Sequence, residues 1–164
     1  MTQTLPQVAH EHHERLLHQV NQLPGIADML LSPNTTEVRP TIVAASAFLT
    51  ETLLPHVDAA ERTLYPELER LFQNRHSMGP MRREHEEIRR LVGDLARLTG
   101  ALEEGPIAIG KALALRRVLF HLYALLRIHL AEEEAYLHIV EHGVTADVAD
   151  VLAAAMDHPG IRAG

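Results

Sequence analysis

Four of the twelve histidines in this chain fall into two pairs, and the members of each pair share a sequence register. His13 and His85 are each followed by an aliphatic residue after three positions, a valine after seven and a leucine after ten. His56 and His129 are each followed by a glutamate after five positions and a leucine after eight. Neutral imidazole is the commonest metal ligand among side chains. The repeated register therefore predicts a metal site to which each of four segments contributes one histidine.

Carboxylates supply the other half of this chemistry. Glu133 follows His129 by four residues, about 40° around a helix, so both side chains can reach one ion. The chain has no cysteine, and imidazole and carboxylate ligands without thiolate suit iron, manganese or zinc. Two such half-sites that face each other hold two metal ions, and carboxylates can bridge them.

The segments that position these side chains show helical spacing of apolar residues, and no long alternating pattern indicates a strand. We expect Pro24-Gly25 to break the first helix, and Pro55 and Pro66 to bend the second. The expected helices cover residues 6–23, then a further turn or two over 26–31, followed by 40–72, 80–98 and 106–142. Long helices with short connections predict an all-α fold, namely an antiparallel up-down-up-down four-helix bundle. A short C-terminal fifth helix is expected over about residues 145–157, in a single domain over residues 1–164 with its core over about 8–142.

The composition excludes several classes of protein. With 22 acidic and 15 basic residues the net charge is −7, which opposes nucleic-acid binding because that function needs a basic face. The longest apolar stretch, residues 118–126, contains His121 and is shorter than the roughly 20 residues of a membrane helix. Residues 1–8 lack the positive charge and apolar core of a secretory signal. We therefore expect a cytoplasmic protein with neither a nucleic-acid nor a membrane partner.

With these motifs the chain resembles the hemerythrin family, specifically its bacterial HHE cation-binding branch, over about residues 8–142. The resemblance rests on His13 ahead of an amphipathic helix, His56 with Leu64-Tyr65-Pro66 downstream, Arg83-Glu84-His85-Glu86-Glu87-Ile88, and His129 with Glu133. It implies a four-helix bundle that encloses a non-haem di-iron site. It also implies the ligand set His13, His56, His85, His129 and Glu133.

One departure from the family pattern concerns the second histidine. The family usually has a glutamate four residues after it, but Ala60 occupies that position and the acid is Glu61. A five-residue step turns Glu61 about 140° away from His56 on an ideal helix. Pro66 crowds the carbonyl group of Arg62 and favours a bulge that would swing Glu61 inward. We hypothesise on this ground that Glu61 is a metal ligand as well.

A second departure lies on the third helix, where Arg89 occupies the position of a further histidine in the oxygen carriers. This argues against reversible oxygen carriage of the invertebrate kind. Other polar residues are candidates to bind the metal or to contact its ligands. These candidates are His10, Tyr65, Glu86, His121, Glu134 and His138.

The expected cofactor is a pair of non-haem iron ions, with zinc or manganese as alternatives, in a monomer or homodimer. The leading functional interpretation is a protein that binds or senses dioxygen, peroxide or nitric oxide, or that handles iron. The alternatives are a di-iron oxidoreductase that decomposes peroxide or oxidises iron, and a bundle scaffold with a degenerate metal site. A ferritin-like site is disfavoured because no Glu-x-x-His occurs, and a zinc protease because no His-Glu-x-x-His occurs.

Overall fold

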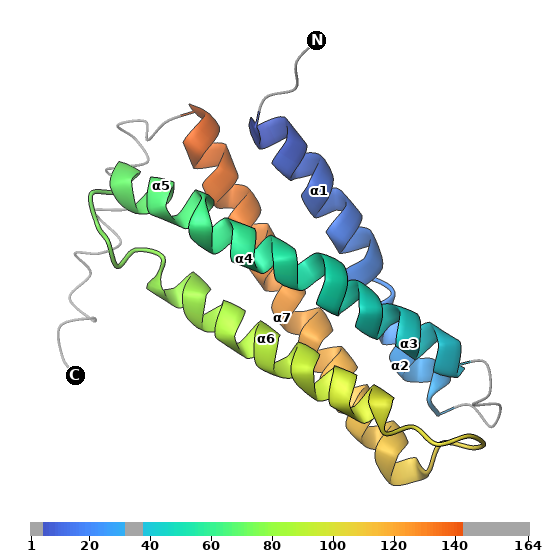
Figure 1. Ribbon diagram of the computed structural model, residues 1–164. Coiled ribbons are helices and arrows are strands. Elements are labelled where there is room, and N and C mark those ends of the chain that lie inside the picture. Colours follow the sequence, from blue (N-terminus) through green and yellow to red (C-terminus); the bar gives the residue numbers. More distant parts are fainter. Residues whose placement is uncertain (1–4, 32–37, 143–164) are drawn as a thin grey trace, which may run out of the picture.

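The computed structural model of the protein describes residues 5–31 and 38–142, and all regular secondary structure in these residues is helical (Figure 1). The prediction of an all-α fold is thereby confirmed, while the expected fifth helix lies outside the described residues. In chain order the elements are α1 (Leu5–Val20), α2 (Leu23–Met29), α3 (Val38–Phe48), η1 (Leu49–Leu53), α4 (Leu54–Arg62), α5 (Leu64–Leu71), α6 (Gly79–Gly100) and α7 (Ile109–His142).

Two of the expected helix boundaries are corrected by the structure. The first helix ends at Val20, and Pro24 lies in the first turn of α2 and does not break a helix. Proline is tolerated there because the amide hydrogens of a first turn have no partner within the helix. The last helix begins at Ile109 and not at Pro106, after a loop in which Gly105 adopts a φ of 96°.

The long second segment is interrupted at both places where the sequence contains an internal proline. Just before Pro55, residues Leu49–Leu53 form a π-helical turn, and the amide of Leu54 donates to the carbonyl of Leu49. Just before Pro66, Thr63 leaves helical geometry with φ −120° and ψ −56°, which separates α4 from α5. A proline supplies no amide hydrogen and crowds the carbonyl four residues earlier, so the helical ladder is disturbed on its N-terminal side.

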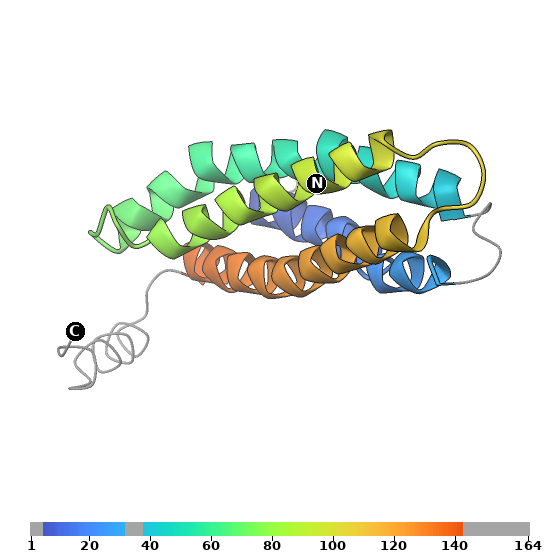
Figure 2. The same cartoon turned by 90° about the horizontal axis from the view of Figure 1, so that it is seen from below.

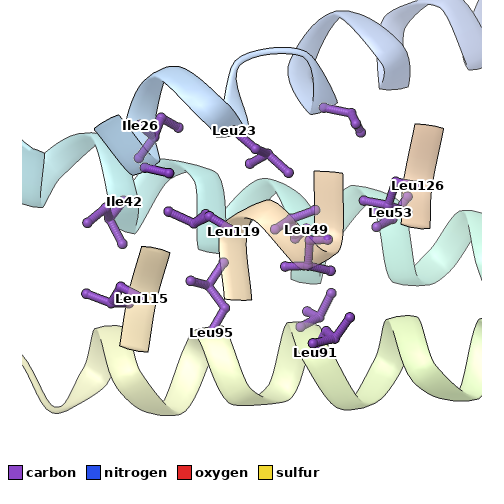
Figure 3. Close-up of a cluster of buried hydrophobic side chains, with 14 of the residues drawn as sticks. Leu23, Ile26, Ile42, Leu49, Leu53, Leu91, Leu95, Leu115, Leu119 and Leu126 are labelled. Atoms are coloured by element: carbon purple, nitrogen blue, oxygen red, sulfur yellow. The ribbon is translucent and has the colours of Figure 1, made fainter. Parts of the chain in front are cut away.

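The long helices pack around a core made mainly of leucine, with valine, isoleucine and alanine side chains. Figures 1 and 2 show α6 and α7 side by side, with α1 and α2 on the other side of α7, and contacts between these elements agree with this arrangement. Figure 3 shows side chains from α2, α3, η1, α6 and α7 converging in this core. The labelled members are Leu23, Ile26, Ile42, Leu49, Leu53, Leu91, Leu95, Leu115, Leu119 and Leu126.

A second, smaller apolar cluster contains Tyr65 and Met81. Helix α6 passes from this cluster to the main core within two turns, because Met81 belongs to the small cluster and Ile88 to the main one. His85 lies between them on the same helix and is fully buried. The buried ionisable residues thus occupy a layer between two apolar clusters. In the described part of the chain, no helix combines the length and apolar character needed to cross a membrane.

Candidate metal centre

The polar layer contains four ionisable side chains that are almost completely buried. His13 is 3% exposed, and His85, His129 and Glu133 are 0% exposed. Ionisable groups are rarely buried to this extent unless they are paired or coordinate a metal. His56 joins the layer from α4, and its side chain is 11% exposed. Each of α1, α4, α6 and α7 therefore contributes one histidine to a single level of the bundle.

These side chains form two groups that can each hold a metal ion, and Glu133 belongs to both. One group is His13, His56 and Glu133, and the other is His85, His129 and Glu133, with the donor atoms of each group within 4.8 Å of one another. Because the same carboxylate appears in both, the two groups form one connected site.

The two oxygens of Glu133 divide between the two groups. Oε2 lies 3.0 Å from Nε2 of His56 and 3.3 Å from Nε2 of His13. Oε1 lies 3.8 Å from Nε2 of His129 and 3.9 Å from Nε2 of His85. One oxygen thus faces each histidine pair, which is the arrangement of a carboxylate that can bridge two metal ions.

Three of the histidines are held from behind by a second carboxylate. Nδ1 of His13 lies 3.0 Å from Glu134 Oε2. Nδ1 of His85 lies 2.9 Å from Glu61 Oε1, and Nδ1 of His129 lies 2.8 Å from Glu84 Oε2. An ionised carboxylate accepts a hydrogen, so these contacts assign a ring hydrogen to Nδ1, and in neutral His85 and His129 this leaves a lone pair on Nε2. Metal-binding histidines are oriented in this way in general.

The pKa shifts agree with a site for cations. Burial alone would raise the pKa of Glu133, but its contacts with His13 and His56 hold that pKa well below the ordinary value. Burial lowers the pKa of His85 and of His129, which favours the neutral ring that binds metal. Burial opposes the charging of His13 as well, but the hydrogen bonds with Glu133 and Glu134 raise its pKa.

Tyr65 reaches the same layer from α5. Its side chain is fully buried, and its hydroxyl group donates to Glu133 Oε1 at 2.9 Å. The hydroxyl oxygen also lies 2.9 Å from Nε2 of His85. The phenol ring stacks on the His85 ring with centroids 5.1 Å apart and planes inclined by 15°. Burial and the nearby Glu133 carboxylate raise the pKa of Tyr65 above its ordinary value.

The structure places Glu61 behind His85 and outside both groups of donor atoms. Its Oε1 contacts Nδ1 of His85 at 2.9 Å and Nη1 of Arg89 at 3.0 Å. The position one residue earlier, Ala60, is the buried one. Although the helix is disturbed at Thr63, the disturbance follows Glu61, whose carboxylate lies beside α6. Any role of Glu61 as a direct ligand stays a prediction.

The remaining candidates divide between the edge of the site and the surface. Glu134 contacts both His13 and His10, and its Oε1 lies 2.5 Å from Nδ1 of His10. The other candidates belong to neither donor group and have exposed side chains. These are Glu86, His121 and His138.

Sequence reasoning missed Glu84, which contacts His129 from the neighbouring helix. Glu84 directly precedes His85 on α6, and the two side chains contact opposite nitrogens of the His129 ring, Glu84 at Nδ1 and His85 at Nε2. Only the packing of α6 against α7 brings it to His129. No motif within one helix could have identified this contact.

Comparison with known proteins agrees with the geometry. A helical bundle with a buried layer of imidazole and carboxylate donors is of the class that can hold metal ions between its helices. The family model described as the hemerythrin HHE cation binding domain matches residues 5–138. The chain therefore belongs to the hemerythrin HHE cation-binding family. No curated protein and no solved structure matches it.

The residues present fit the metal that this family implies, typically iron. With hydrogens on both Nδ1 atoms, the Nε2 atoms of His85 and His129 would direct two lone pairs at each other across 2.9 Å. A cation between them resolves this repulsion. Imidazole and carboxylate donors without sulfur suit iron, although they also suit zinc and manganese.

Proposed function

We propose that the protein binds two non-haem iron ions and uses them to bind or sense dioxygen, peroxide or nitric oxide. The observation that carries the proposal is the division of Glu133, with one oxygen toward His13 and His56 and the other toward His85 and His129. His13 and His56 would hold one ion, His85 and His129 the other, and Glu133 both. Bound iron would supply a redox-active centre to which a small ligand can bind.

The charges around the site support a pair of cations. Glu133 is an ionised carboxylate in a fully buried position. Three further carboxylates stand directly behind the histidines, namely Glu61, Glu84 and Glu134. Because charge in a protein interior is costly unless it is compensated, the buried Glu133 favours a cation beside it, and the three partly exposed carboxylates orient the histidines that would bind that cation.

The enclosure of the site favours a small ligand. The donor atoms lie in a layer between two apolar clusters, and four of their side chains are at most 3% exposed. A ligand of more than a few atoms would have to displace buried side chains. Diatomic molecules and peroxide need little space, so they fit this environment better than organic substrates.

A titration with nitric oxide tests the proposal. The iron-loaded, reduced protein is mixed with nitric oxide without oxygen, and its optical spectrum is expected to change up to a saturating amount per chain. His129→Ala is expected to abolish or strongly reduce the change, whereas His121→Ala, an exposed histidine on the same helix, is the matched control. A loaded wild-type protein whose spectrum does not respond to nitric oxide, dioxygen or peroxide would contradict the proposed function.

The second candidate function, an oxidoreductase that decomposes peroxide or oxidises iron, is favoured by one observation. The hydroxyl of Tyr65 lies within the layer beside Glu133, and a hydrogen kept there after metal binding would stand where an enzyme needs a proton donor. Decay of peroxide measured over many equivalents separates the two functions. A binding protein consumes about as many equivalents as it has sites, whereas an enzyme consumes far more.

A further inference from the structure

The two halves of the candidate centre differ in the position of the Tyr65 hydroxyl group. Its oxygen lies 2.9 Å from Nε2 of His85 and 2.9 Å from Oε1 of Glu133. Oε1 is the oxygen that faces His85 and His129, whereas Oε2 contacts His13 and His56. The hydroxyl therefore lies on the side of His85 and His129. Four possible donor atoms meet there, namely the Nε2 atoms of the two histidines, Oε1 of Glu133 and the oxygen of Tyr65.

These four donor atoms have fewer hydrogens than their contacts require. Three separations of 2.9 Å connect the Tyr65 oxygen to Glu133, the Tyr65 oxygen to His85, and His85 to His129. The hydrogens of both rings are engaged by carboxylates at Nδ1. The Tyr65 hydroxyl can donate to only one acceptor at a time, so its single hydrogen leaves two of the three contacts without one. A cation shared by the four atoms satisfies all of them.

The separations also match a coordination sphere in size. Neighbouring ligands at about 2.0–2.1 Å from an ion lie about 2.9 Å apart when they meet at 90°, and about 3.3 Å apart at the tetrahedral angle. The contacts of the Tyr65 oxygen with His85 and Glu133 are 2.9 Å each. Glu133 Oε1 lies 3.8 Å from Nε2 of His129 and 3.9 Å from Nε2 of His85. The contacts of the Tyr65 oxygen match neighbouring ligands at 90°, and Glu133 Oε1 would have to move closer to both histidines to share one ion with them.

The fold holds the Tyr65 ring in this position. The interruption at Thr63 begins α5, which carries Tyr65 into the layer, and the buried Ala60 is small enough to leave room for the ring. The His85 ring stacks on the Tyr65 ring, and the Arg82 guanidinium lies 5.6 Å from the centroid of the Tyr65 ring. A cation near the ring also stabilises negative charge on the phenol oxygen.

We propose that the oxygen of Tyr65 is the fourth protein ligand of the ion held by His85, His129 and Glu133. The inference rests on the proposed function, since it requires the metal. On binding, the O–H bond of Tyr65 breaks, an oxygen–metal bond forms, and the proton passes to water without any change in oxidation state. The ion at His13 and His56 would have three protein donors, one fewer than the ion at His85 and His129, so it would leave more positions for a small ligand.

Ferric iron bound to a phenolate absorbs visible light, and this property provides the test. The protein is loaded with ferrous iron, exposed to air, and examined by metal analysis, optical spectroscopy and resonance Raman spectroscopy. The wild type is expected to show a visible charge-transfer band and, on excitation in it, phenolate ring vibrations. Both signals are expected to vanish in Tyr65→Phe and to persist in Tyr136→Phe, which removes a hydroxyl outside both donor groups.

Each result bears on the proposal. Iron-loaded wild type without phenolate signals, or signals that persist in Tyr65→Phe, would overturn the Tyr65 assignment and leave the proposed function intact. A wild type that takes up no iron would overturn both. If Tyr65→Phe does not fold, the double variant Tyr123→Phe/Tyr136→Phe decides, because the chain has only three tyrosines. Signals retained in that variant assign the phenolate to Tyr65, and their loss would contradict the assignment.

Discussion

Nε2 of His85 and Nε2 of His129 lie 2.9 Å apart, and the other nitrogen of each ring contacts a carboxylate. Glu61 contacts His85 at 2.9 Å, and Glu84 contacts His129 at 2.8 Å. The carboxylates hold the ring hydrogens outside the pair, so the two lone pairs face each other within the bundle. This relationship is unfavourable without a cation and favourable with one, so we expect bound metal to stabilise the fold.

Removal of metal is accordingly expected to lower thermal stability. A ligand present at 100 times its Kd stabilises the folded state by about 2.7 kcal/mol. One kcal/mol corresponds to roughly 2–4 °C in a domain of this size, so a chelator is expected to lower the Tm by roughly 5–10 °C. Circular dichroism melting curves with and without chelator measure the shift. An identical Tm in both would show that metal does not stabilise this fold.

Loss of the carboxylate behind His129 is expected to weaken metal binding without removing a ligand. Glu84→Ala frees the His129 ring from the group that orients it, and changes of this type lower metal affinity by roughly 10–100-fold. Competition with a chromophoric chelator measures the affinity. Glu86→Ala alters an exposed glutamate on the same helix and is expected to leave the affinity unchanged. Equal affinities in the two variants would contradict a role for Glu84.

Glu61 offers a direct comparison between a ligand and a group that orients a ligand. Because its carboxylate contacts Nδ1 of His85, we expect Glu61→Ala to keep the number of metal ions per chain and to lower the affinity by roughly tenfold. His85→Ala is expected to lower the number itself. Metal analysis after gel filtration distinguishes the two. A reduced number in Glu61→Ala would instead support its predicted role as a ligand.

The stability of the metal-free protein is expected to decrease with acidification. Burial places the pKa of His85 and of His129 below the ordinary value, so the unfolded chain takes up protons first as the pH falls. The contribution of these two rings to the free energy of unfolding is complete above about pH 6.5. It is lost as the pH falls through their pKa values in the folded protein. The pKa of His13 is raised, and its contribution is lost in the opposite direction, as the pH rises above about 6.5.

Melting curves of the metal-free protein between about pH 7 and pH 5 check this expectation. The Tm of the wild type is expected to fall over this range, and His129→Gln is expected to show a shallower dependence. A wild-type Tm that rises with acidification over the same range would show that the buried rings are not the controlling groups.

The helical fold and the convergence of the histidines could be predicted because both depend on local periodicity. His13 and His85 share one register and His56 and His129 another, and side chains at matching levels of packed helices meet. Glu133 followed from its four-residue spacing to His129, since residues so spaced lie on one face of a helix.

Other features of the candidate centre depend on irregular or tertiary geometry. The position of Tyr65 depends on the interruption at Thr63, where the backbone leaves helical geometry. Regular helical spacing therefore does not predict the direction of the Tyr65 side chain. The contact of Glu84 with His129 depends on how α6 packs against α7. The bulge expected to turn Glu61 inward would have had to precede that residue, but the interruption comes two residues after it. Sequence spacing therefore identified the donors within each helix, and not the groups that reach them from neighbouring helices.

The number of iron ions per chain tests the central claim most directly, in the wild type and in Glu133→Gln. The chain is loaded with ferrous iron, freed of excess by gel filtration, and analysed for metal and protein. Glu132→Gln, at the adjacent exposed position, is the matched control. Because Glu133 belongs to both donor groups, we expect two ions in the wild type and in the control, and fewer than one in Glu133→Gln. A wild type without stoichiometric iron, or a Glu133→Gln variant that retains both ions, would contradict the account.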